Sequence, residues 1–122
     1  MAVQELNKDG FLRRVWNYGE GKSMWRFQGN VPAVVDFYAS WCGPCKALSS
    51  VLEELSDTYK ERVDFYKVNT GEELELASHF GVRSVPTLLF CPLDGAPFMV
   101  RGAMPKNELE DEIEKSFFQD NC

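Results

Sequence analysis

The sequence predicts an α/β protein with a mixed β-sheet between helices, built as a single domain over residues 1–122. Apolar segments of strand length alternate with amphipathic helical segments, which indicates that consecutive strands pair in parallel. A turn at 92–95 with hairpin chemistry separates the last two strand segments and adds antiparallel pairing. A chain of this length can also bury a core without crosslinks.

The N-terminal part of the chain alternates short apolar segments with a polar connection. The predicted segments are a strand at 3–6, a helix from the N-cap Asn7 to Tyr18-Gly19 and an extended connection at 17–30. Trp25 and Phe27 lie in that connection at no clean period. They are interpreted as packing over the flank of the core, with a partner-docking surface as the alternative.

The rest of the chain carries the longer elements. These are a strand at 33–39, a helix from Cys45 to Tyr59, strands at 63–69, 85–90 and 98–101, a short helix after Thr70 and a last helix from Pro105 to Phe117. The nearly all-apolar strand at 33–39 is expected to be central and covered on both faces. Thr70 and Glu73 form a capping-box pattern for the short helix. The acidic run at 108–114 is interpreted as a solvated face, and residues 120–122 are expected to be flexible.

Composition and charge argue against several partners. The net charge of −6 provides no basic field for nucleic acid. No apolar run approaches the roughly 20 residues that span a bilayer. The N-terminus has neither a basic start nor an apolar stretch of signal-peptide length, so a cytoplasmic location is expected. The periplasm is the alternative if a signal peptide has been removed.

Of the four cysteines, only Cys42 and Cys45 lie close together in the sequence. This count indicates one reactive pair and two single cysteines. A zinc site needs about four ligands, and the distant Cys91, Cys122 and His79 do not supply a second clustered pair, so no metal is expected. Cys91 is interpreted as a small packed residue and Cys122 as a free thiol at the flexible end.

The two thiols of the pair differ in their position on the predicted helix. Cys42 lies ahead of the first full turn, where it is expected to be exposed. The helix N-terminus should lower the pKa of its thiol from about 8.5 towards neutrality, which makes Cys42 the expected nucleophile. Cys45 lies on the buried face of the helix and is the expected resolving thiol, which attacks a mixed disulfide and releases the product.

Asp36 interrupts the otherwise apolar central strand, six positions before Cys42. A carboxyl group there would be desolvated, so its pKa should be raised. We interpret Asp36 as a proton acceptor and donor for Cys45, with a structural hydrogen-bonding role as the alternative. Lys67, in the next strand, is a possible charge partner of Asp36; an exposed lysine is the alternative.

These residues carry a family resemblance over residues 31–117. The segment Trp41-Cys42-Gly43-Pro44-Cys45-Lys46, with Val35-Asp36-Phe37 before it and Val85-Pro86-Thr87 and Gly102 after it, resembles the thioredoxin family. The resemblance implies a five-stranded mixed sheet flanked by four helices, and a cis Pro86 against the cysteine pair. It also implies a groove for an extended substrate segment. The implied substrate-binding residues are Trp41, Gly43, Pro44, Val85, Pro86, Gly102 and Ala103.

The resemblance also implies a function. The expected activity is that of a general protein disulfide reductase whose redox-active disulfide joins Cys42 and Cys45. No bound cofactor is expected, because the electrons come from NADPH through a thioredoxin reductase. The other expected partners are disulfide-bearing proteins, and a monomer is expected. Gly43-Pro44 resembles the reducing branch of the family; an oxidising or isomerising relative, or a redox-linked protein-binding module, is the alternative.

Overall fold

The computed structural model of the chain describes residues 3–18 and 24–119. Within them lie five strands and four α-helices. The strands are β1 (Val3–Glu5), β2 (Ala33–Tyr38), β3 (Asp64–Asn69), β4 (Thr87–Cys91) and β5 (Phe98–Arg101). The helices are α1 (Lys8–Arg14), α2 (Gly43–Thr58), α3 (Leu74–His79) and α4 (Lys106–Ile113), and a π-helical turn at Glu114–Phe118 continues α4.

The strands form one mixed sheet in the order β1-β3-β2-β4-β5. Strands β1 and β2 both pair with β3 in parallel, and β4 pairs antiparallel with β2 and β5. Strand β2 is therefore central, and Ala33 to Phe37 are all buried. The five-stranded mixed sheet and the four helices confirm the fold implied by the resemblance.

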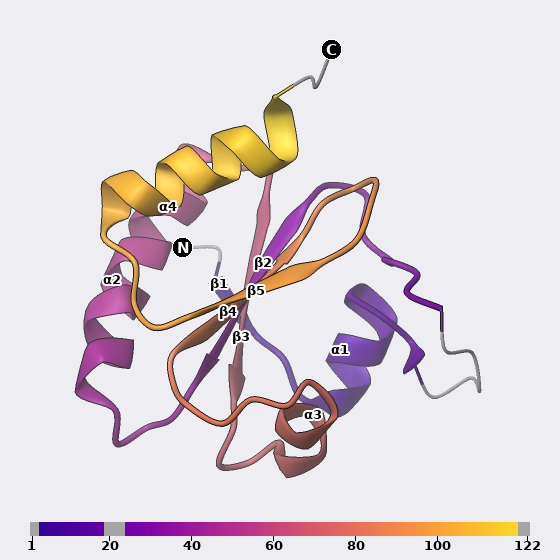
Figure 1. The fold of residues 1–122 in the computed structure, drawn as a ribbon, viewed down its shortest axis with the longest axis vertical. Helices are drawn as coiled ribbons and strands as arrows, with labels where there is room; N and C mark the ends of the chain where they lie inside the picture. The colour runs from indigo at the N-terminus through magenta and orange to yellow at the C-terminus, as the bar shows by residue number, and fades with distance from the viewer. Residues whose placement is uncertain (1–2, 19–23, 120–122) are drawn as a thin grey trace.

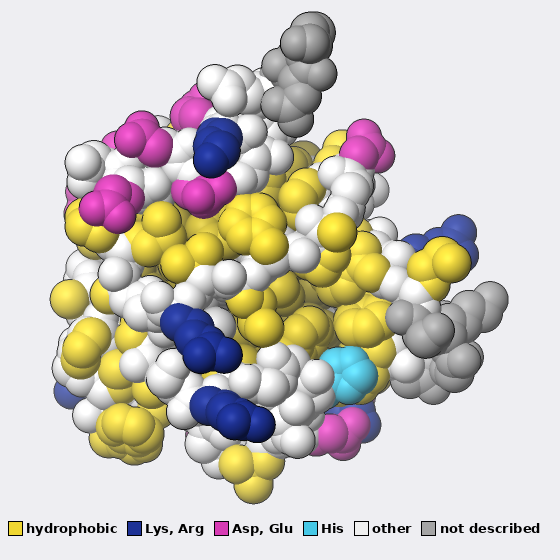
Figure 2. Space-filling model, in the orientation of Figure 1, with side chains coloured by type: hydrophobic (Ala, Val, Ile, Leu, Met, Phe, Trp, Pro, Cys, Tyr) yellow, Lys and Arg dark blue, Asp and Glu magenta, His cyan; other side chains and the backbone are white. Residues whose placement is uncertain are grey.

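The helices cover both faces of the sheet (Figure 1). Alternate residues of a strand point to opposite faces, so Val34 and Val35 belong to different core clusters. Val34 packs in the cluster that contains Leu52 of α2 and Leu109 of α4. Val35 packs in the cluster that contains residues of α1 and α3. Figure 2 shows acidic side chains gathered over α4, which agrees with a solvated face for that helix.

Two expected helix boundaries are wrong. The first helix ends at Arg14 instead of near Tyr18, because the chain turns at Val15 and carries Trp16 and Tyr18 against His79 at the end of α3. The aromatic rings of Tyr18 and His79 stack with centroids 3.8 Å apart. Packing between distant segments, rather than local helix preference, ends α1.

The predicted capping box of the short helix is also absent. Helix α3 begins at Leu74, and Glu73 makes no side-chain cap bond. The hydroxyl group of Thr70 instead donates to the carbonyl oxygen of Tyr38, at 3.0 Å. The Glu73 carboxylate accepts from the backbone N–H of Lys8, also at 3.0 Å. Both side chains are taken up by partners more than 30 residues away in sequence, which the local pattern cannot anticipate.

The connection before β2 runs along the core. Trp25 and Phe27 are partly buried and pack against the core cluster of α1 and α3, which confirms the preferred interpretation. Residues 120–122, including Cys122, lie outside the described residues, as do 19–23 within the connection. Over the described ranges, no helix has the length and apolar character needed to span a bilayer.

Candidate redox site

A disulfide between Cys42 and Cys45 stands at the junction of β2 and α2. The chain leaves β2 in a turn closed by the N–H of Cys42 donating to the Ala39 carbonyl oxygen, at 3.2 Å. Cys42 is then the N-cap of α2, and its sulfur accepts the N–H of Cys45 at 3.1 Å. Pro44 fits the first turn because an N–H there has no helical partner to lose. The helix therefore directs a backbone donor at Cys42 Sγ.

Cys42 is more buried than the sequence predicted. Only 4% of its surface is exposed in this disulfide form, whereas an exposed thiol was expected. The loop before β4 covers it, with the carbonyl oxygen of Val85 3.8 Å from Cys42 Sγ. Cys45 is 2% exposed, which agrees with its expected place on the buried helix face. Beside the disulfide, Trp41 is 80% exposed.

The loop that covers Cys42 runs from α3 to β4 and is hydrogen-bonded to the chain just after β5. The Val85–Pro86 peptide bond is cis. The N–H of Gly102, just after β5, donates to the Pro86 carbonyl oxygen at 2.8 Å. Gly102 has φ +92°, a left-handed conformation that favours glycine. This bond holds the end of β5 against the loop, so Val85, Pro86 and Gly102 lie on one side of the disulfide.

The structure thus brings together segments that are far apart in the sequence. The other expected substrate-binding residues are neighbours of these along the chain. Trp41 precedes Cys42, Gly43 and Pro44 lie between the cysteines, and Ala103 follows Gly102. All four are exposed.

Asp36 lies behind the disulfide, in the middle of β2. Only 2% of its surface is exposed, and its Oδ1 atom has no hydrogen-bond partner among the described residues. Burial raises the pKa of the Asp36 carboxyl from 3.8 to about 7; the positive charge of Lys67 lowers it by less, and the negative charge of Glu5 raises it further. Burial dominates because it penalises the charged form.

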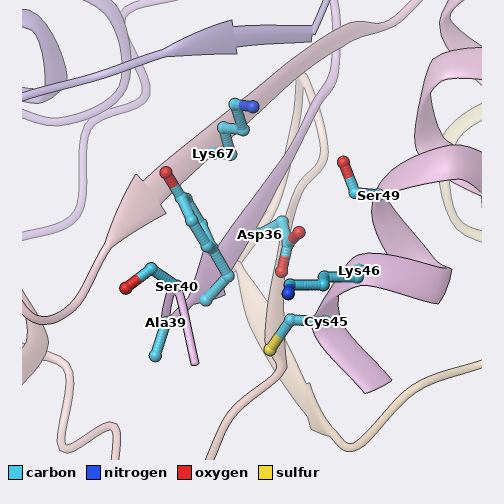
Figure 3. Close-up of a pocket in the computed structure, with 8 residues that line it drawn as sticks. Asp36, Ala39, Ser40, Cys45, Lys46, Ser49 and Lys67 are labelled. Atoms are coloured by element: carbon cyan, nitrogen blue, oxygen red, sulfur yellow. The ribbon is translucent and has the colours of Figure 1, made fainter. Parts of the chain in front are cut away.

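Asp36 and Cys45 line the same cavity, whose volume is about 160 Å³. Strand β2 and helix α2 supply most of its lining, and Lys67 comes from β3 (Figure 3). The Asp36 side chain points from the strand towards the helix, on the side where Cys45 lies. A cavity of this size and lining can hold water. The Asp36 carboxyl and Cys45 thus face one space that has room for water.

Lys67 is next to Asp36 across the β2–β3 ladder. No close ion pair joins the two side chains, so Lys67 acts on the carboxyl through space. Its ammonium group lies 5.7 Å from the centre of the Tyr38 ring, which is a cation–π distance. The positive charge of Lys67 thus interacts with both the Asp36 carboxyl and the Tyr38 ring.

Glu5 was not recognised from the sequence. The Tyr38 hydroxyl donates to both oxygens of the Glu5 carboxylate, at 2.7 and 2.9 Å. Glu5 is also the register partner of Lys67 across the β1–β3 ladder. Nothing in the sequence pattern shows that β1 pairs with β3, so no local signal could have placed Glu5 beside the site.

Two residues of α2 were also missed. Lys46 and Ser49 line the cavity with Asp36. Ser49 follows Cys45 by four positions, and side chains at this spacing share one helix face. Helical spacing from Cys45 could have identified Ser49.

No metal site competes with the redox interpretation in the part of the chain that the structure describes. Over residues 3–18 and 24–119, no three side chains of His, Cys, Asp or Glu come together as a group that could hold a metal ion.

Comparisons with known proteins agree with this geometry. The family model described as Thioredoxin matches residues 25–115. A thioredoxin of Borreliella burgdorferi is 45% identical over 118 residues, which cover 97% of this chain and 98% of that protein. An M-type chloroplastic thioredoxin of Spinacia oleracea is 41% identical over 76% of this chain and 53% of that protein. A crystal structure of chloroplastic thioredoxin z shares the fold, with a TM-score of 0.79 over 94% of both chains at 20% identity. The matches in sequence and in fold together show that the chain belongs to the thioredoxin family.

Proposed function

We propose that this protein reduces disulfide bonds of other proteins by thiol–disulfide exchange. The observation that carries the proposal is the Cys42–Cys45 disulfide at the start of α2, with the N–H of Cys45 directed at Cys42 Sγ. A backbone donor at a helix N-terminus stabilises a thiolate. Cys42 is therefore the nucleophile of the reduced protein.

The reaction proceeds in two exchanges. The Cys42 thiolate attacks one sulfur of the substrate disulfide, forms a mixed disulfide and releases the other substrate sulfur as a thiolate, which takes up a proton. Cys45 then loses its proton and attacks Cys42 Sγ. The Cys42–Cys45 disulfide forms, and the second substrate sulfur leaves as a thiolate, which takes up a proton. The substrate gains two electrons from the protein and two protons: one is the proton that Cys45 gives up, and the other comes from solvent, to which Cys42 lost its proton on becoming a thiolate.

Asp36 is the proposed acceptor of the Cys45 proton. A carboxyl with a pKa of about 7 is partly ionised at neutral pH, so it can take up and return a proton in each cycle. The cavity lined by both residues provides the route. Lys67 supports this role by favouring the ionised carboxylate.

The substrate segment is proposed to bind beside Val85, Pro86, Gly102 and Ala103, next to the exposed Trp41. Backbone groups of a loop can bind an extended peptide, and this loop touches Cys42 Sγ. Gly43 and Pro44 complete the proposed substrate-binding surface, since a small residue and a proline leave the approach to Cys42 open.

We further propose that a thioredoxin reductase regenerates the dithiol with electrons from NADPH. The protein is expected to act as a monomer in the cytoplasm, without a bound cofactor. An oxidising or isomerising role is the alternative. Neither Gly43 nor Pro44 offers the imidazole that stabilises the thiolate in oxidising relatives, which favours the reducing role.

The reduction potential of the Cys42–Cys45 disulfide tests the direction of electron flow. It can be measured by equilibrating the protein with dithiol buffers of known potential. We expect a value near the roughly −270 mV that is typical of thioredoxin. A value of about −180 mV or higher would instead indicate an oxidase or isomerase.

Turnover of a model protein disulfide tests the nucleophile. Cys42→Ser should abolish dithiol-driven reduction, whereas Cys91→Ala should retain it, because Cys91 is buried in β4 and is not bonded to the pair. Unchanged turnover in Cys42→Ser would refute the assignment.

A further inference from the structure

We propose that Arg83 and Arg101 form a cationic rim beside the disulfide, which selects substrate disulfides that have an acidic residue close to the attacked cysteine. This inference rests on the proposed reductase function and names its substrate class. The cationic rim is defined here as these two arginines.

Arg83 belongs to the loop that covers the disulfide, and Arg101 belongs to the strand whose end is bound to this loop. Arg83 lies two residues before Val85, whose carbonyl oxygen is 3.8 Å from Cys42 Sγ. Arg101 ends β5 and is the register partner of Thr87. It precedes Gly102, whose N–H binds the Pro86 carbonyl oxygen. The rim is therefore formed by one arginine on the Val85–Pro86 loop and one at the strand end next to it.

Three stretches of sequence near the site lack acidic residues, although the chain has 19 of them and the buried Asp36 lies behind the disulfide. Residues 39–52, 76–93 and 95–107 contain no Asp or Glu, and they carry Lys46, Arg83, Arg101 and Lys106. These stretches have a charge of +4, so the remaining residues must carry −10 to give the net charge of −6. These three stretches thus bear the opposite sign to the rest of the molecule.

The rim arginines are available to a partner. Arg83 and Arg101 are exposed, and neither forms an ion pair with any residue that the structure describes. Lys106, in contrast, is paired with Glu54 at 3.2 Å. Figure 2 shows Lys or Arg side chains in the area between α2 and α3, surrounded by hydrophobic and uncharged atoms, while acidic side chains gather over α4. Charge complementarity therefore points to an acidic occupant.

The geometry limits where the acidic residue can lie. A substrate sulfur bonded to Cys42 sits beside Val85, and an extended peptide advances about 3.3 Å per residue. A substrate side chain about two positions from the attacked cysteine then lies opposite Arg83 or, on the other side, opposite Arg101. The preferred substrate has Asp or Glu within about three positions of that cysteine.

The test uses two disulfide peptides that differ only in Asp or Asn two positions from one cysteine. The second-order rate constant for their reduction by the reduced protein is measured at low and high salt. We expect the wild type to reduce the Asp peptide about fivefold faster at low ionic strength, with the ratio falling below about twofold at roughly 0.5 M salt. Reduction of the Asn peptide alone tests the proposed function.

Variants of Arg83 and Arg101 test whether the preference for the Asp peptide depends on the charges of the cationic rim. The double variant R83E/R101E should invert the ratio, and R83K/R101K should retain it because the charges remain. Lys60→Glu is the matched control, because it makes the same change in charge per residue on an exposed side chain. Lys60 lies just past the end of the 16-residue helix α2, roughly 24 Å from the disulfide at its start. This variant should leave the ratio unchanged.

Three results would overturn the inference. One is a wild-type ratio near one at low salt, and another is an unchanged ratio in R83E/R101E. The third is inhibition by inorganic phosphate far beyond that of chloride at the same ionic strength, which would indicate a site for small anions. Failure of the wild type to reduce either peptide would overturn the proposed function itself.

Discussion

Replacing Asp36 by asparagine should stabilise the folded protein, and the gain should grow with pH. The buried carboxyl has a pKa of about 7 in the folded state and an ordinary value of 3.8. The folded protein therefore holds this proton more tightly than the unfolded chain. The contribution of Asp36 to stability is fully present below pH 3.8, and it is lost as the pH rises through 7.

The size of this loss follows from the two pKa values. Each pKa unit corresponds to about 1.4 kcal/mol, so a difference of about three units costs about 4 kcal/mol above pH 7. Asparagine has nearly the shape of the protonated acid and does not ionise. The variant should match the wild type near pH 4 and exceed it by about 4 kcal/mol near pH 8.

Urea unfolding of the oxidised protein at several pH values between 4 and 8.5 measures this effect. Asp94→Asn is the matched control, because the same chemical change is made at an exposed position between β4 and β5. It should change stability little at any pH. An Asp36→Asn effect that does not vary with pH would refute the argument, because it would mean that the buried carboxyl has an ordinary pKa.

Three further changes test the site and its support. Cys45→Ser should trap substrates as a mixed disulfide on Cys42, visible by intact-mass spectrometry, because the resolving thiol is absent. Glu5→Gln removes a negative charge that raises the pKa of Asp36, so the pH midpoint of disulfide reduction should fall. Gly102→Ala should cost about 1–2 kcal/mol in urea unfolding, since alanine is strained at φ +92°.

Each of these changes has a control. Adducts found mainly on Cys91 of the Cys45→Ser protein would contradict the role of Cys42. Glu108→Gln, on the exposed face of α4, should leave the pH midpoint where it is. Gly43→Ala should be tolerated in unfolding experiments, because an added Cβ meets nothing within 4 Å. Equal costs at Gly43 and Gly102 would argue against backbone strain at Gly102.

Much of the fold could be predicted because the patterns that encode it are local. The apolar run at Ala33–Ala39 predicted a central strand, and β2 is central. Cys45 was predicted to be buried from helical spacing alone, and it is. The helix boundaries failed where distant partners intervene. The capping pattern of Thr70 and Glu73 is lost because these side chains bind Tyr38 and Lys8 instead.

The sequence by itself determined the redox pair, its position at a helix start and the unusual carboxyl in an apolar strand, since spacing along the chain encodes all three. The tertiary structure decided how these groups are surrounded. It buried Cys42 beneath Val85 and opened a cavity between Asp36 and Cys45. It also placed Glu5 beside Tyr38, because β1 pairs with β3. Burial and charge at a site depend on segments that meet only when the sheet and its loops assemble, and spacing along the chain carries no record of those contacts.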